Sequence, residues 1–128
     1  MTQVKIYGRR DVWAGRQREV SDALQAALVT AWDLPAAKRF HRFLLLDDDD
    51  LVAPGRSPAY LVVELVAFTG RSDAAVRRLM TALNDDVAPA LGLAADDLEA
   101  VLIEVPASRW AIRGVVGDEL SLDYRVDV

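Results

Sequence analysis

The chain has 128 residues, of which 52% are hydrophobic, and a formal net charge of −5. This length and composition fit one compact domain over residues 1–128 with a core of its own. With no cysteine and one histidine, the chain excludes disulfides, thiol catalysis and cysteine-ligated metal, and we expect neither a metal nor a cofactor. The negative charge argues against nucleic-acid binding. Because no basic apolar leader or long apolar run is present, we expect a cytoplasmic protein without membrane contact.

The first part of the chain predicts a strand, a long helix and a second strand. Apolar and polar residues alternate over residues 2–7, as in a half-buried strand. An apolar stripe at helical spacing predicts a helix over residues 12–32, which Pro35 ends. Residues 39–46 alternate again and predict the second strand of a β-α-β unit.

The region between the halves is rich in charge and turn residues. Asp47–Asp50 is an acidic run, which is typical of a solvated loop. A cation site is the alternative, but the run lacks the glycine and the spacing of a calcium loop. Residues 53–58 form a short turn-rich linker.

The second part of the chain repeats the first. Residues 60–68 are almost continuously apolar, which indicates a strand buried on both faces, with Glu64 as an exception that needs a partner. A helix is predicted over residues 73–91, capped by Ser72. Residues 100–105 predict the fourth strand.

A Gly-Arg-x-Asp turn opens both helices, so the sequence predicts two β-α-β pseudo-repeats, at about 2–46 and 60–106, and a carboxyl-terminal extension, 107–128. The expected fold class is α/β (α+β): a four-stranded sheet with two helices on one face, plus a carboxyl-terminal strand or hairpin. Alternation over residues 120–128 predicts a strand that pairs with an edge on a neighbouring subunit. The uncovered sheet face predicts a closed symmetric oligomer.

Five segments carry a resemblance to a known family: Val4–Gly8, Lys38–Phe43, Phe68–Ser72, Glu104–Pro106 followed by Trp110–Gly114, and Gly117–Val126. In these segments the chain resembles the tautomerase superfamily, in the long, internally duplicated, homotrimeric branch that is 4-oxalocrotonate tautomerase-like. The resemblance covers nearly the whole chain. It implies a tautomerase fold, a homotrimer and a small carboxylate or keto-acid ligand.

The resemblance implies that an amino-terminal proline acts as the general base, but Thr2 stands at that position. The chain therefore resembles a subgroup that lacks this proline, and the standard proline-based mechanism is not available to it. If Met1 is removed, Thr2 offers a primary amine, which titrates near pH 8 and acts as a base or forms a Schiff base. If Met1 is retained, we expect the amine to be displaced by about 3.5 Å.

Other site positions are carried over one at a time. Arg71 matches an arginine that binds a substrate carboxylate in relatives, and an arginine near a helix amino terminus suits an anion. A surface arginine that closes a turn is the alternative. Lys38 stands at about the position of an acidic residue that activates water in decarboxylase relatives, so that chemistry is disfavoured. Trp110 matches a pocket-wall tryptophan, with core or interface packing as the alternative.

The remaining candidates are His41 and three arginines. His41 on its strand is a candidate acid-base group, but a structural histidine held by a hydrogen bond is the alternative that we favour. Arg39, Arg42 and Arg113 are further candidates for binding a substrate anion, with surface ion pairs as the alternative.

Two functions follow from the sequence. The first is an isomerase of small 2-keto or enol acids with weak or altered activity. The second is a non-catalytic trimeric binding or scaffold protein that has lost the tautomerase base. The residues do not decide between them.

Overall fold

A four-stranded sheet forms the centre of the computed structural model, which describes all residues, 1–128. The spatial order is β2-β1-β3-β4, with β1 and β2 parallel, β3 and β4 parallel, and the central pair β1 and β3 antiparallel. Each parallel pair is one β-α-β unit, and the two units are joined through their first strands. The strands are β1 (Thr2–Arg9), β2 (His41–Leu46), β3 (Leu61–Phe68) and β4 (Leu98–Val105).

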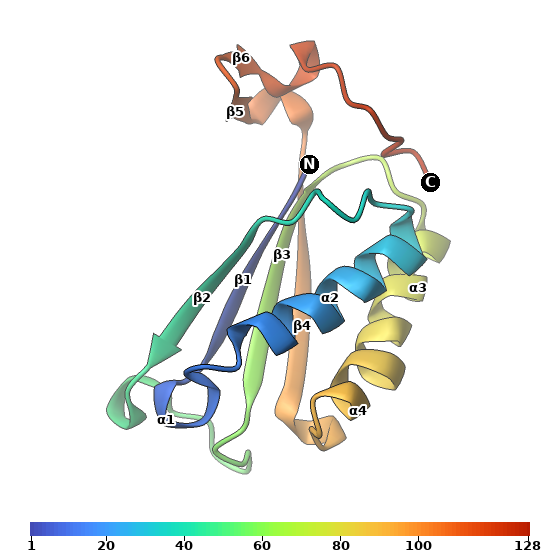
Figure 1. Cartoon of the computed structure of the whole chain (residues 1–128). Coiled ribbons are helices and arrows are strands. Elements are labelled where there is room, and N and C mark those ends of the chain that lie inside the picture. The colour runs from blue at the N-terminus through green and yellow to red at the C-terminus, as the bar shows by residue number, and fades with distance from the viewer.

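Two long helices cover one face of this sheet (Figure 1). They are α2 (Gln17–Trp32) and α3 (Asp73–Ala82); α3 continues through a π-helical turn (Leu83–Val87) into α4 (Ala88–Ala90). The core consists of 22 buried residues from the inner faces of the strands and helices. The predicted arrangement of four strands with both helices on one face is confirmed.

The first predicted helix is interrupted. The structure has a short helix α1 (Arg10–Trp13) and then α2, with a turn between them. Gly15 lies in this turn with a φ of 87°, a left-handed conformation that favours glycine. The prediction of one helix over residues 12–32 is therefore wrong at its start, because the apolar stripe continues across the turn and hides it.

The second helix begins as predicted. The side-chain oxygen of Ser72 accepts a hydrogen bond from the backbone N–H of Ala75 at 3.2 Å, which caps α3. The π-helical turn precedes Pro89, which has no N–H to donate to the carbonyl four residues earlier. The helical path thus runs to Ala90 with one widened turn.

The carboxyl-terminal extension forms a hairpin and an extended tail. The hairpin pairs β5 (Ala111–Ile112) with β6 (Val115–Val116). Residues 120–128 pair with no strand of this chain, and their expected pairing with a neighbouring subunit stays a prediction. The tail ends where the Ser72 N–H donates to the Val128 carbonyl at 2.9 Å. The tail and both chain ends lie at the same end of the sheet (Figure 1). Short 3-10 turns occur at Asp48–Asp50, Ala95–Asp97, Ala107–Arg109 and Gly117–Glu119.

The second face of the sheet is not covered by any helix (Figure 1). Glu64 lies in β3 and, as expected, has partners: the Tyr7 hydroxyl donates to it at 3.2 Å, and the Lys5 ammonium lies at 3.8 Å. Val101 and Ile103 of β4 are 45% and 44% exposed. An apolar surface of this kind is typical of a contact between subunits. No helix is long and apolar enough to cross a membrane.

Candidate functional site

The start of β1 lies beside the end of β3, where the chain places its amino terminus. The side chains of Met1 and Thr2 are buried, and the Phe68 N–H donates to the Met1 carbonyl at 3.1 Å. Strand pairing brings Thr2 opposite Ala67. Thr2, at the position where the resemblance implies the base, is therefore held in the sheet by strand pairing.

Arg71 follows β3 at the same end of the sheet and is only 7% exposed. Its guanidinium lies over the Trp32 ring, 3.8 Å from the centroid, and one of its N–H groups donates to the Phe68 carbonyl at 3.2 Å. The other two nitrogen atoms, Nε and Nη2, are buried and have no hydrogen-bond partner. Buried donors without acceptors are costly, so Arg71 is well suited to binding an anion.

Other cationic groups gather near Arg71. Burial, together with the positive charges of Arg71 and Lys38, lowers the pKa of the Met1 amine to about 5. This amine is therefore neutral at pH 7. The Met1 amine lies within electrostatic reach of Arg71, and the expected displacement of the amine by a retained Met1 stays a prediction.

The tail contributes Tyr124 and Asp123 to this end of the sheet. Burial raises the pKa of Tyr124, although the charges of Arg71 and Arg113 act in the opposite direction. Tyr124 thus keeps its phenolic proton at neutral pH. Asp123 lies 3.5 Å from the Lys38 ammonium. Arg71, Arg113, Lys38 and the Met1 amine are therefore grouped around the tail, and we call this group the terminal cluster.

A cavity of about 600 Å³ lies beside the terminal cluster. Asp123 and Tyr124 form one wall, and residues from the end of α2 and the following turn form the other. A space of this size accommodates a small organic acid. No group of the terminal cluster lines this cavity itself; Asp123 and Tyr124 connect the two, through the ion pair of Asp123 with Lys38 and the charges of Arg71 and Arg113 near Tyr124.

His41 belongs to a different cluster. Its Nδ1 lies 2.7 Å from the Ser21 hydroxyl of α2, while Arg39 donates to Ser21 at 3.3 Å and to Asp22. Burial, together with the positive charge of Arg39, lowers the pKa of His41 to about 4. The buried Nε2 has no partner. His41 is therefore neutral at pH 7 and is oriented by Ser21, a partner that the sequence alone did not reveal.

The neutral state of His41 makes stability depend on pH. The pKa of His41 is 6.5 in the unfolded chain and about 4 in the folded protein. Between these two pH values the unfolded chain therefore binds more protons than the folded protein. The stabilisation is complete above about pH 6.5 and is lost as the pH falls through 4, for a total of about 3 kcal/mol. In His41→Asn, whose amide can still accept from Ser21, the unfolding free energy from urea titrations should fall less over this range. An identical pH slope in both proteins would contradict the assignment.

The remaining predicted residues lie outside the terminal cluster. Arg42 donates to the Gln3 side chain at 2.8 Å. Trp110 packs edge-on against Phe68, with 5.1 Å between the ring centroids. The structure therefore groups Thr2, Arg71 and Arg113 near one another, and places His41 with Arg39 elsewhere.

Similarity to known proteins identifies the family of this chain. The family described as tautomerase enzyme matches residues 38–113, which is well over half of the chain. The chain belongs to the tautomerase family. The family match includes Lys38, His41, Arg71 and Trp110, whereas the amino-terminal strand and the tail lie outside it.

Solved structures agree with this family and show the same fold. A malonate semialdehyde decarboxylase, FG41, solved with 3-bromopropiolate as inhibitor, is 26% identical, with a TM-score of 0.79 over 94% of this chain and 98% of the other. A fused 4-OT asymmetric trimer is 19% identical, with a TM-score of 0.81 over 91% and 97%. A member of the cis-3-chloroacrylic acid dehalogenase family is 19% identical, with a TM-score of 0.77 over 89% and 82%.

For this tautomerase-family protein, the sequence alone did not reveal Lys38 as a member of the terminal cluster, nor Tyr124 and Trp32 as residues beside it. Lys38 was considered only as a replacement for an acidic residue, whereas its ammonium charge lies near the Met1 amine. Tyr124 was part of a predicted strand, and Trp32 was one residue in an apolar stripe. No sequence signal marks these residues, because their proximity depends on the path of the tail.

The duplicated turn gives the tautomerase-family chain a second arginine for comparison. Arg9 holds in the Gly-Arg-x-Asp motif of the first unit the place that Arg71 holds in the second, although Arg9 is the last residue of β1 and Arg71 follows β3. Arg9 is paired with Asp11 at 2.6 Å and Asp48 at 2.7 Å. Arg71 has no carboxylate within ion-pair distance. Only the second unit thus leaves its arginine without a carboxylate partner.

Proposed function

We propose that this protein is an isomerase that interconverts the keto and enol forms of small 2-oxo acids, with the amino-terminal amine as base and Arg71 as carboxylate anchor. The observation that carries this proposal is a neutral, partly buried amine within electrostatic reach of a buried arginine that has two unpartnered nitrogen atoms. A base must be deprotonated before it can accept a proton, and an anchor must have free donors. The terminal cluster supplies both.

The proposed reaction balances without any other reactant. The substrate carboxylate accepts hydrogen bonds from Nε and Nη2 of Arg71. The neutral amine takes a proton from the carbon next to the keto group, and the electron pair moves to the keto oxygen. Lys38, Arg113 and the Tyr124 hydroxyl stabilise the negative charge that develops on this oxygen. The proton then passes to the oxygen and yields the enol, and the reverse sequence yields the keto acid.

This mechanism uses a primary amine where the resemblance implies a proline. Primary amines are ordinary general bases, and the low pKa of this amine keeps it unprotonated above about pH 5. The same low pKa makes it a weaker base than one that titrates near pH 7. We therefore expect weak activity that rises as the pH passes through 5 and then stays constant.

The test is phenylpyruvate ketonisation by the purified protein, combined with intact-mass analysis. The mass shows whether the terminal amine belongs to Met1 or to Thr2. A rate above that of buffer, with a pH profile that rises near 5, supports the proposal. Ketonisation no faster than buffer at every pH between about 4 and 9, a range that spans the folded and ordinary amine pKa values, would refute it.

A non-catalytic binding protein is the second candidate. The observation in its favour is Thr2 itself, whose side chain is buried and whose hydroxyl has no hydrogen-bond partner. In this case Arg71 would bind a small acid without turnover. Because Arg71 lies on Trp32, ligand binding should change tryptophan fluorescence. A saturable fluorescence change with no ketonisation would favour the binding protein over the isomerase.

We further propose that the functional unit is a homotrimer. The support is the exposed apolar face of the sheet, where Val101 and Ile103 lie, together with the trimeric fused 4-OT structures that share the fold. Closed symmetric assembly is the usual way to bury such a face. The terminal cluster would then lie near a neighbouring subunit, which supplies further walls to the cavity.

A further inference from the structure

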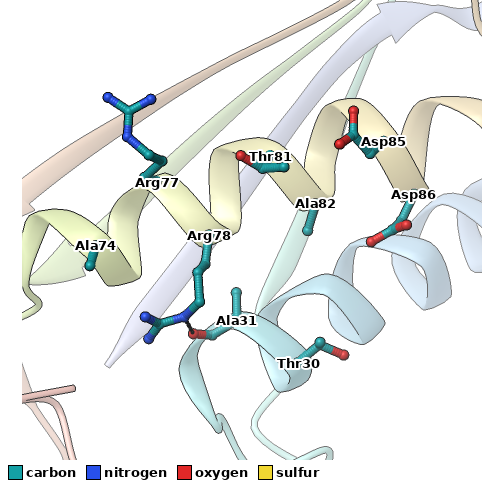
Figure 2. Close-up of a pocket in the computed structure, with 9 residues that line it drawn as sticks. All are labelled: Thr30, Ala31, Ala74, Arg77, Arg78, Thr81, Ala82, Asp85 and Asp86. Atoms are coloured by element: carbon teal, nitrogen blue, oxygen red, sulfur yellow. Dashed lines mark hydrogen bonds between the residues drawn. The ribbon is translucent and has the colours of Figure 1, made fainter.

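A groove of about 560 Å³ lies on the outer surface of the two helices, away from the sheet and from the terminal cluster. Figure 2 shows that α3 and its continuation supply one side and the end of α2 the other. The floor carries small side chains, among them Ala31, Ala74 and Ala82. No large side chain fills the groove, so another helix can approach closely.

The two ends of this groove carry opposite charges. Arg77 and Arg78 project at one end, and Asp85 and Asp86 project at the other (Figure 2). All four residues are exposed. None forms an ion pair within the chain. The Arg78 side chain makes only a long hydrogen bond to the Ala31 carbonyl, at 3.4 Å.

The charges are placed symmetrically along the helix. Arg77 and Asp86 lie at equal distances in sequence from the midpoint between Thr81 and Ala82, as do Arg78 and Asp85. Nine residues of helix correspond to about 13 Å. A two-fold axis through this midpoint would therefore bring the arginine pair of one chain onto the aspartate pair of another.

We propose that this groove binds the same groove of a second copy of the chain, with the two α3 helices antiparallel. The argument for a second copy rather than another protein is that one chain supplies both charge pairs in a two-fold arrangement. An isologous contact needs such self-complementarity. Small residues at Thr81 and Ala82 allow close approach at the axis. The contact uses neither the sheet face nor the terminal cluster, so it does not depend on the proposed function.

The first test reverses the charges. In sedimentation velocity at up to about 1 mM chain, where weak contacts populate, the wild type should form a particle of at least twice the mass of the variants. R77D/R78D has only acidic side chains at the contact and D85R/D86R only basic ones, so neither variant should associate with itself. A mixture of the two variants should associate again, because the acidic contact of one chain meets the basic contact of the other. R18D, at an exposed site elsewhere on α2, serves as the charge control and should associate like the wild type.

The second test uses the absence of cysteine. Thr81→Cys places a sulfur next to the proposed axis, and mild oxidation should convert most of the chain into a covalent pair. Arg18→Cys, away from the groove, should cross-link much less. Equal cross-linking of both variants, an unchanged mass after charge reversal, or failure of the mixed variants to associate would each overturn the proposal.

Discussion

Replacing Arg71 with methionine should remove most keto-enol turnover while leaving the fold intact. Methionine fills a similar space over Trp32 but carries no donor for a carboxylate. We expect kcat/KM for phenylpyruvate ketonisation to fall at least ~100-fold, which corresponds to about 3 kcal/mol of transition-state stabilisation. The free energy of unfolding should change by less than about 2 kcal/mol, since the lost cation–π contact is offset by removal of buried, unpartnered nitrogen atoms.

The combination of these two readouts makes the test specific. A residue with a purely structural role would lose stability and activity together. Arg9→Met is the matched control, because Arg9 holds the equivalent place in the Gly-Arg-x-Asp motif of the first unit but is paired with aspartates. It should leave kcat/KM within about threefold of the wild type. Full activity in Arg71→Met would exclude Arg71 as the carboxylate anchor.

Extending the chain before Met1 should abolish activity completely. An added residue converts the amine into an amide, which is not a base, and the buried position of Met1 leaves little room for extra atoms. The rate of ketonisation should drop to that of buffer. Removing the extension with a protease that leaves Met1 as the first residue should restore the rate, and this cleaved protein is the control for folding.

Variation at position 2 then identifies the best base. When Met1 is removed, Thr2→Pro offers a secondary amine and Thr2→Ala a primary amine of similar placement. Higher activity in Thr2→Pro than in Thr2→Ala would show that the other groups of the terminal cluster still support catalysis by an amino-terminal proline, the base that the family resemblance implies. Activity that survives the amino-terminal extension would contradict the role of the amine, whatever stands at position 2.

The order and type of the main elements could be predicted because local patterns agree with tertiary burial. Alternation in β1 places Val4 and Ile6 in the core, and the Ser72 cap begins α3. The turn at Gly15 was hidden because apolar spacing continued on both sides of it. The tail alternates like a strand but pairs with no strand of its own chain, so its expected pairing with a neighbouring subunit stays a prediction.

The site was less predictable than the fold for a physical reason. Arg71 was marked by its turn, but its lack of a carboxylate partner depends on where every acidic residue lies in space. Lys38 acquired a role through Asp123, which is 85 residues away in the sequence. The hydrogen-bond partner of His41 in β2 is Ser21, which lies on helix α2. Contacts of this kind depend on packing, which periodicity does not describe.

The central antiparallel pairing of β1 with β3 gives the subunit an approximate two-fold symmetry, and the aspartates around Arg9 break that symmetry in electrostatic terms. In the first unit the acidic residues already occupy the place of a ligand. The duplication therefore gives the chain two arginines at equivalent positions of the repeated motif. The side chains of Asp11 and Asp48 pair with the first of these arginines, Arg9. If Arg71 anchors the ligand as proposed, each subunit should bind one ligand, and the proposed trimer should carry three ligand sites instead of six.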